Sequence, residues 1–221
     1  MGAYQQISKM YRNGIKAKAA ELGYSDVNLC VLDGDIEILK LRYPSCFANL
    51  QSCVHNKDAR SLIEYARDLV ASWIFEDTIV QMLNSAGLKT ALSGTDSNRE
   101  ILATTKVSSS SDCTISNDSK RRHLEIMSDY TGWWERTGHM ELRDAKFTKL
   151  VREKALFLGV CTVSCKYILF DFAKPVNATY IAAHKPYGGK PAYSIKIEEA
   201  ALSKFLMPPL VERLKASLSD A

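Results

Sequence analysis

Two carboxylates in the middle of the chain have the spacing of a metal site on a β-hairpin. Asp112 starts one short predicted strand, and Glu125 lies near the middle of the next one. If these carboxylates oppose each other directly, the same register pairs Asn117 with Lys120 and leaves Asp118-Ser119 as a two-residue loop. The segment between the strands is rich in turn formers, so the turn and the carboxylate pairing agree.

The alternation of side chains along the second strand indicates the environment of this pair. His123, Glu125 and Met127 share one face, whereas Leu124 and Ile126 point to the other face, into the core. The two carboxylates are then expected side by side on an otherwise polar face. Their repulsion would be relieved by Mg²⁺, which prefers hard oxygen ligands. An ion there can activate water and neutralise charge on a phosphoryl oxygen, so the pair predicts phosphodiester chemistry.

A third carboxylate and a later helix extend the pattern. Glu76 interrupts the apolar periodicity of a long helix predicted before the hairpin, and residues 142–147 open a helix predicted after it. Helix glutamate, hairpin and following helix in this order resemble the PD-(D/E)XK nuclease superfamily. Its motif is an acidic residue, a hairpin turn and an acidic-x-Lys triplet on the next strand. The resemblance covers about residues 65 to 172 and implies a restriction-endonuclease-like α/β fold, a mixed sheet flanked by helices.

The resemblance also implies roles for these residues. The chain would be a magnesium-dependent hydrolase of double-stranded DNA, with one or two ions at each site. Asp112 and Glu125 would hold the main ion, and Glu76 would be a ligand of a second ion or lie in its shell. Alanine in place of these carboxylates should abolish cleavage and spare binding.

The last position of the triplet departs from the family, because Met127 stands where the motif has lysine. A thioether cannot orient water or stabilise an anion as an ammonium group can. Three explanations are open. Two metals alone suffice; a lysine comes from elsewhere, with Lys146 on the next helix and Lys106 on the preceding strand as candidates; or the site is inactive.

Basic and aromatic residues around the motif predict contacts with DNA. Candidates for phosphate contacts are Arg99, Lys106, Lys120, Arg121, Arg122, Arg136 and Arg143. Base edges would be read by the segments 133–139 and 184–191, with the candidates Trp133, His139, Lys185, Tyr187 and Lys190. The alternatives are an ordinary solvated hairpin end at residues 120–122 and a packing role for Trp133.

Composition sets wider bounds. A chain of 221 residues with 46% hydrophobic content can bury a full core, and a net charge of +4 permits a nucleic-acid partner without predicting one. The N-terminus lacks an apolar leader and the six cysteines are scattered, which predicts free thiols in a reducing cytoplasm. No stretch approaches the roughly 20 apolar residues that a membrane span needs.

The expected organisation is an N-terminal helical extension over residues 1–57 and a nuclease domain over 58–221, forming one compact unit. Helices are predicted around residues 7–22, 58–83 and 141–158 and at the C-terminus, with Gly87 ending the long second helix. Strands are predicted at residues 100–107, 113–116, 124–127, 166–172, 178–183 and 192–197.

The leading functional hypothesis is a sequence-specific restriction endonuclease of type II, acting as a homodimer so that two sites cut two strands. A structure-specific nuclease of the same superfamily, such as a junction resolvase or a repair nuclease, is the second hypothesis. The third is a DNA-binding protein that keeps the nuclease fold without catalysis, with Met127 as the visible mark of the loss.

Overall fold

The computed structural model describes residues 2–11, 14–53, 60–94, 96–102, 111–117, 120–198 and 201–219. The chain divides into two compact units: Met1–Ile79 with Thr95–Ser108, and Val80–Gly94 with Ser109–Ala221. The boundary expected between residues 57 and 58 lies outside the described residues.

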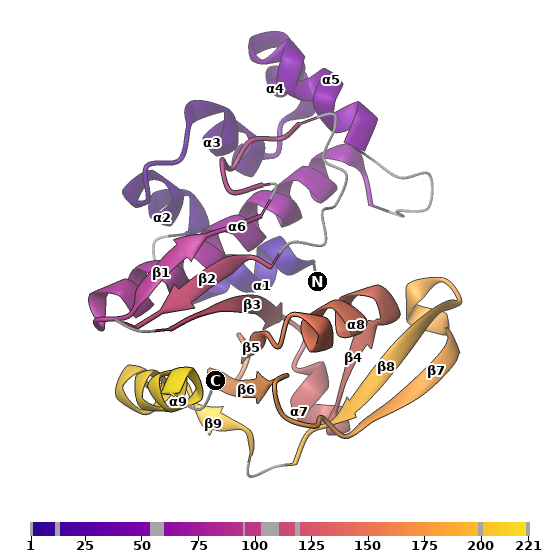
Figure 1. The fold of residues 1–221 in the computed structure, drawn as a ribbon. Coiled ribbons are helices and arrows are strands. Elements are labelled where there is room, and N and C mark those ends of the chain that lie inside the picture. Colours follow the sequence, from indigo (N-terminus) through magenta and orange to yellow (C-terminus); the bar gives the residue numbers. More distant parts are fainter. Residues whose placement is uncertain are drawn as a thin grey trace. The chain divides into compact units, whose positions relative to one another are not determined.

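The first unit is helical (Figure 1). Its helices are α1 (Ala3–Met10), α2 (Ile15–Glu21), α3 (Asp26–Asp33), α4 (Ile36–Arg42), α5 (Pro44–Cys53) and most of α6 (Leu62–Ser85). A polar break separates α3 from α4, because Gly34 adopts φ 80° and the Asp35 carboxylate accepts hydrogen bonds from the first N–H groups of α4. The single helix expected over residues 7–22 is wrong, since α1 and α2 are separate helices.

The long amphipathic helix predicted from the apolar spacing is confirmed as α6. Ala66, Val70, Trp73 and Ile74 are buried along one side of it, as the three- and four-residue spacing requires. Gly87 follows its end with φ 86° and donates its N–H to the Asn84 carbonyl. The predicted role of Gly87 in ending the helix is therefore confirmed.

The second unit is built on a six-stranded mixed sheet with the order β1-β2-β3-β5-β6-β9. Strands β3 and β5 run parallel, and the other neighbours are antiparallel. The strands are β1 (Lys89–Leu92), β2 (Cys113–Ser116), β3 (Arg121–Asp129), β5 (Leu156–Cys161), β6 (Lys166–Asp171) and β9 (Ser203–Lys204). With helices α8 (Asp144–Arg152) and α9 (Met207–Ser219), this mixed α/β architecture confirms the expected fold class (Figure 1).

The helix expected over residues 141–158 is wrong at both ends. The segment forms β4 (His139–Arg143), then α8, then β5. Lys154 adopts φ 49° after α8, and the Ala155 N–H returns to the Leu150 carbonyl, which ends the helix. Every residue of β5 is buried, as in a strand covered on both faces. The strand expected at 100–107 is not seen at residues 100–102, and residues 103–107 lie outside the described part.

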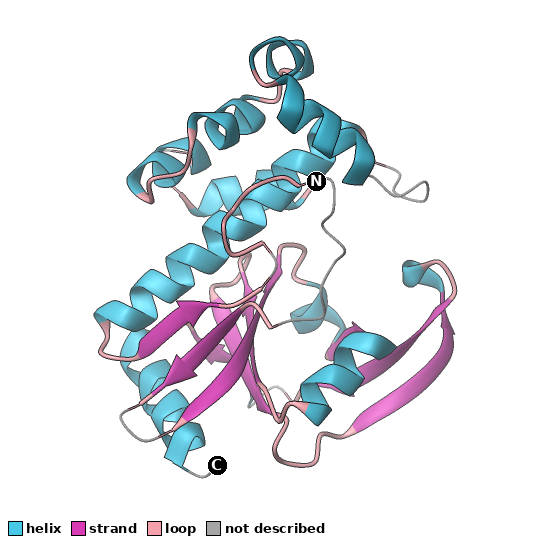
Figure 2. Cartoon of the chain, turned by 45° about the horizontal axis from the view of Figure 1, so that its top comes forward, coloured by secondary structure: helices cyan, strands magenta, loops and turns pink. Residues whose placement is uncertain are grey.

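A second sheet of three strands has the order β4-β8-β7, with β7 (Ala178–His184) and β8 (Lys190–Lys196). Figure 2 shows β7 and β8 as a long antiparallel ribbon beside α8. The short helices α7 (Trp133–Thr137) and η1 (Lys185–Tyr187) lie in the two segments predicted to read base edges. Both sheets and α8 contribute to one apolar cluster: Trp134, Met140, Leu142, Leu150, Ala155, Phe157, Ile168, Phe172, Ile195 and Ile197.

Among the described residues, no helix combines the length and the apolar character that crossing a membrane requires. All six cysteines lie in the described part of the chain and are thiols, as the sequence predicts.

Gly159 on β5 leaves room for an indole ring in the apolar cluster. A Cβ at this position would lie 2.7 Å from Trp134 Cζ3 and 2.9 Å from Ile168 Cγ1. Because both neighbours are buried and rigid, Gly159→Ala should lower the free energy of unfolding by about 1–3 kcal/mol. Urea denaturation measures the change. Gly2→Ala is the control, because its Cβ would meet nothing closer than 3.6 Å, and equal losses in both variants would contradict the packing explanation.

Candidate active site

The register of the β2–β3 hairpin is the one predicted from the two carboxylates. Cys113 pairs with Leu124 and Ser116 pairs with Arg121. The Asn117 N–H donates to the Lys120 carbonyl at 3.0 Å, which confirms the expected pair at the turn. The expected loop residues 118 and 119 lie outside the described part. Continued by one residue in the other direction, this register places Asp112 opposite Glu125.

Asp112 is held by both neighbouring strands. Its carbonyl accepts the Ser93 N–H at 2.9 Å, so the pairing between β1 and β2 extends through Asp112. Its carboxylate oxygen Oδ2 accepts the backbone N–H of Ile126 at 2.8 Å. The side chain of Asp112 is therefore fixed against β3, beside the backbone of Glu125.

Glu125 lies in a buried environment and not on the polar face expected from the sequence. Glu125 is only 4% exposed, and its partner in register on β5 is the fully buried Phe157. Helix α8 covers this face and supplies two ammonium groups. Lys146 Nζ lies 2.5 Å from Glu125 Oε1, and Lys149 Nζ lies 3.7 Å from Glu125 Oε2. The carboxylate thus faces the ammonium groups of two lysines from one helix.

Met127 belongs to the apolar part of the same face. It packs against the apolar cluster and pairs in register with Gly159, where Trp134 lies against the strand. A lysine at position 127 would place its ammonium group next to these apolar side chains. Lys146, in contrast, reaches Glu125 from α8 with 36% of its side chain exposed. The structure therefore brings one of the two candidate replacement lysines to the carboxylate; the other, Lys106, lies outside the described residues.

A lysine at position 127, as in the motif that the sequence resembles, should cost stability and gain nothing. We expect Met127→Lys to lower the free energy of unfolding by about 1–3 kcal/mol, because the new ammonium group must leave the apolar cluster or be buried in it. Met127→Leu, which conserves the volume, should change it by less than about 1.5 kcal/mol. Thermal denaturation and a cleavage assay test both variants. Faster cleavage by Met127→Lys at unchanged stability would show that position 127, not Lys146, faces the reacting phosphate.

The residues present fit a hard divalent cation. Glu125 Oε2 is buried and has no hydrogen-bond partner within the described structure, which is the state of a carboxylate oxygen placed for a cation. Of the described residues, no three His, Cys, Asp or Glu side chains gather as a metal site. Mg²⁺ is commonly held by one or two carboxylates together with water and substrate phosphate, so the Asp112–Glu125 pair is a sufficient protein contribution.

Glu76 belongs to the first unit, where it takes part in an ion-pair cluster. Arg99 Nη1 lies 3.1 Å from Glu76 Oε2, and Arg99 Nη2 lies 2.5 Å from Asp77 Oδ1. The Tyr24 hydroxyl donates to Asp77, and burial, reinforced by this carboxylate, raises the pKa of Tyr24 above its ordinary value. These contacts give Glu76 a structural role in its unit, and its assignment as a metal ligand stays a prediction.

Two of the expected phosphate contacts are used inside the fold. Arg99 is neutralised by the carboxylates of Glu76, Asp77 and Asp96, and its side chain is 11% exposed. Arg122 is 8% exposed, pairs with Asp171 and donates to the carbonyls of Lys154 and Ser217. Because carboxylates and carbonyls of the fold bind their N–H donors, the structure does not support Arg99 and Arg122 as phosphate contacts. At the hairpin end, Arg121 is exposed, and Lys120 donates to the carbonyl of Ser219.

The other described candidates lie in or next to the two segments expected to read base edges, and the fold brings those segments together. The first leads into β4 and the second forms the η1 turn beside β8. The Tyr187 hydroxyl donates to the Glu141 carbonyl at 2.7 Å, which ties one segment to the other. The candidates on strands β4 and β8, on α7 and on the η1 turn are His139, Arg143, Lys190, Trp133, Arg136, Lys185 and Tyr187.

Lys149 is the site residue that the sequence reading missed. It is 4% exposed, a rare state for lysine, and its ion-pair partner among the described residues is Glu125. Lys146 and Lys149 are three residues apart and so lie on one side of α8. This spacing was visible in the sequence, but only the burial of the helix face marks the second lysine as part of the site.

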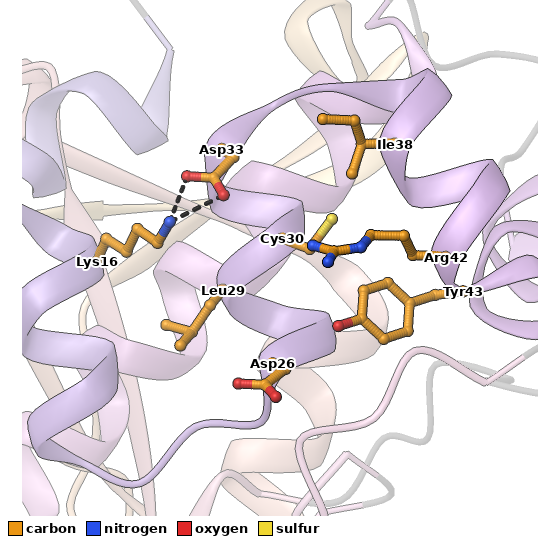
Figure 3. Close-up of a pocket in the computed structure, with 8 residues that line it drawn as sticks. All are labelled: Lys16, Asp26, Leu29, Cys30, Asp33, Ile38, Arg42 and Tyr43. Atoms are coloured by element: carbon orange, nitrogen blue, oxygen red, sulfur yellow. Dashed lines mark hydrogen bonds and ion pairs between the residues drawn. The ribbon is translucent and has the colours of Figure 1, made fainter.

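A cavity of about 590 Å³ in the first unit has a different character (Figure 3). It is lined by Lys16, Asp26, Leu29, Cys30, Asp33, Ile38, Arg42 and Tyr43. Lys16 Nζ and Asp33 Oδ1 form an ion pair at 2.6 Å, which neutralises one of its two carboxylates. Burial, aided by Asp33, raises the pKa of the Cys30 thiol, so the thiol is a weak nucleophile. These groups do not form a catalytic arrangement.

Comparison with known proteins gave no match to a protein-family model and none to a curated protein sequence. Among solved structures, the chain is similar to Hjc, a Holliday junction resolvase from the archaeal hyperthermophile Archaeoglobus fulgidus. The identity is 12%, the match covers 65% of this chain and 98% of that one, and the TM-score is 0.39. A similarity of this strength says nothing about the substrate of this chain.

Proposed function

We propose that this chain is a divalent-metal-dependent DNA endonuclease. Asp112 and Glu125 are the metal ligands, and Lys146 takes the place of the lysine that the motif lacks at Met127. The observation that carries the proposal is the 2.5 Å contact between Lys146 Nζ and Glu125 Oε1, beside a carboxylate pair fixed by the hairpin register. An acidic pair and an adjacent ammonium group are the parts needed to bind and polarise a phosphodiester.

Each residue then has a defined task. Asp112, anchored by the Ile126 N–H, and Glu125 supply the hard oxygen ligands for Mg²⁺. When bound, the ion would lower the pKa of a water molecule and neutralise charge on the phosphoryl group. Lys146, partly exposed, donates from its ammonium group to a phosphate oxygen that enters beside Glu125. Lys149, which is buried, holds the Glu125 carboxylate in place through their ion pair.

The restriction-enzyme and structure-specific hypotheses from the sequence share this chemistry and differ in the DNA that is cut. The protein is incubated with supercoiled plasmid, with linear duplex and with a four-way junction, each with Mg²⁺ or with EDTA. Discrete plasmid fragments indicate a sequence-specific restriction enzyme, and cutting of the junction alone indicates a structure-specific nuclease. Binding without cutting of any substrate would overturn the nuclease proposal and leave the non-catalytic DNA-binding protein.

A double-strand cut needs two active sites, and the homodimer expected from the sequence would supply the second one. This assembly stays a prediction. Sedimentation of the protein with and without duplex DNA measures it directly.

A further inference from the structure

The three-stranded sheet has one apolar and one polar face. On β4, Met140 and Leu142 are buried in the apolar cluster, whereas His139 and Arg143 are exposed and Glu141 is half-buried on the opposite face. Their partners on β8 in register lie on the same face and include Ser194 and Lys196. We call this opposite side the outer face.

Aromatic side chains hold the cations of the outer face in place. Trp133 Nε1 donates to Glu141 Oε2 at 2.9 Å, and the guanidinium carbon of Arg136 lies 5.3 Å from the Trp133 ring. The guanidinium of Arg143 lies at the same distance from the Tyr187 ring. Ring contacts thus position both arginines. Because a ring contact does not use the guanidinium N–H donors, these donors remain available to an anion.

Carboxylates balance the charge of the outer face only in part: Lys196 pairs with Glu198, and Glu141 accepts a hydrogen bond from Trp133. Arg136 and Arg143 have no ion-pair partner within 4 Å in the part of the chain that the structure describes. Elsewhere in this unit, several cations are paired with carboxylates: Lys166 with Glu135, Arg152 with Glu153 and Lys215 with Glu212. Lys185 and Lys190 in the adjacent turn are also exposed. This cationic surface is complementary to a polyanion.

The outer face leads to the proposed active site. Arg143 is the last residue of β4, and Asp144 begins α8 directly after it. Lys146, the lysine at Glu125, is therefore three residues from Arg143, within one turn of helix. His139 and Arg143 are separated by about 13 Å along the strand, the length of about four base-pair steps.

We propose that the outer face of the three-stranded sheet is the docking surface for the DNA backbone, with Arg136 and Arg143 as its phosphate contacts. The inference rests on the proposed function for its ligand and adds where that ligand is held. The backbone runs from Arg136 on α7 along β4 to Arg143 and reaches Lys146 at the start of α8. Trp133 and Tyr187 position the arginines and are not base-stacking platforms.

Fluorescence anisotropy with a fluorescein-labelled 30-base-pair duplex in EDTA tests this surface without turnover. Arg136→Gln and Arg143→Gln should each weaken binding by about 5–10-fold near 0.1 M salt. Each should also reduce the slope of log Kd against log salt by about 1, since one phosphate contact is lost. The matched controls are Arg152→Gln and Lys215→Gln, which remove one exposed but carboxylate-paired cation each and should change Kd by less than twofold.

Equal weakening of DNA binding in the controls would show that only net charge matters, and would overturn the docking surface. An unchanged salt slope in the arginine variants, or no DNA binding by the wild type, would overturn it as well. The cleavage assay separates this inference from the proposed function. Cleavage that needs Asp112 but not the arginines overturns the surface alone. Arginine-dependent binding without cleavage of any DNA overturns the nuclease alone.

Discussion

Asp112→Asn should abolish DNA cleavage and leave the hairpin folded. The amide oxygen of asparagine can still accept the Ile126 N–H that Asp112 Oδ2 accepts at 2.8 Å, so the contact with β3 is kept. The charge that holds the cation is lost. Removing several kcal/mol of transition-state stabilisation corresponds to a fall of about 1,000-fold or more in cleavage rate. Single-turnover cleavage with excess enzyme measures it, with Mg²⁺ titrated over a wide range.

Two further measurements make this result specific. DNA binding in EDTA and the thermal midpoint should stay close to wild type, because the docking surface and the hydrogen bond are intact. Asp144→Asn, a change to a nearby carboxylate at the start of α8, is the control and should alter the rate only a few-fold. Cleavage by Asp112→Asn at a rate near wild type would remove Asp112 from the site and with it the proposed function.

The hairpin could be predicted because its information is local. Turn formers at residues 117–119 and the alternation around Glu125 specify one register, and β2 and β3 pair in it. Helix α6 was equally predictable, because its apolar spacing persists over many turns. Strand β4 was hidden, since its five residues join α8 without a turn and the combined segment has an apolar pattern compatible with one longer helix.

The environment of the carboxylates could not be read from the sequence. Alternation assigned Glu125 to a polar face, and only the packing of α8 shows that this face is buried and that two lysines accompany the carboxylate. Glu76 and Arg99 are 23 positions apart in the first unit, and no local sequence pattern predicts that they pair. The same holds for Arg122, whose partners lie 32, 49 and 95 residues away. Long-range contacts therefore decided which charged residues remain available for DNA.

The second large effect separates the two lysines of α8. Lys146→Gln should lower the cleavage rate by about 100-fold, since the ammonium group that contacts the phosphate is lost. Its free energy of unfolding should change by less than about 1 kcal/mol, because the Lys146–Glu125 pair is partly exposed to solvent.

Lys149→Met removes the buried partner of the same carboxylate and should lower the free energy of unfolding by about 3 kcal/mol. Cleavage rates measured well below each variant's melting temperature, together with urea denaturation, distinguish a catalytic lysine from a supporting one. If Lys146→Gln lost stability and kept its rate, the ammonium group at Glu125 would be a structural ion pair, and the motif lysine would have to come from another part of the chain.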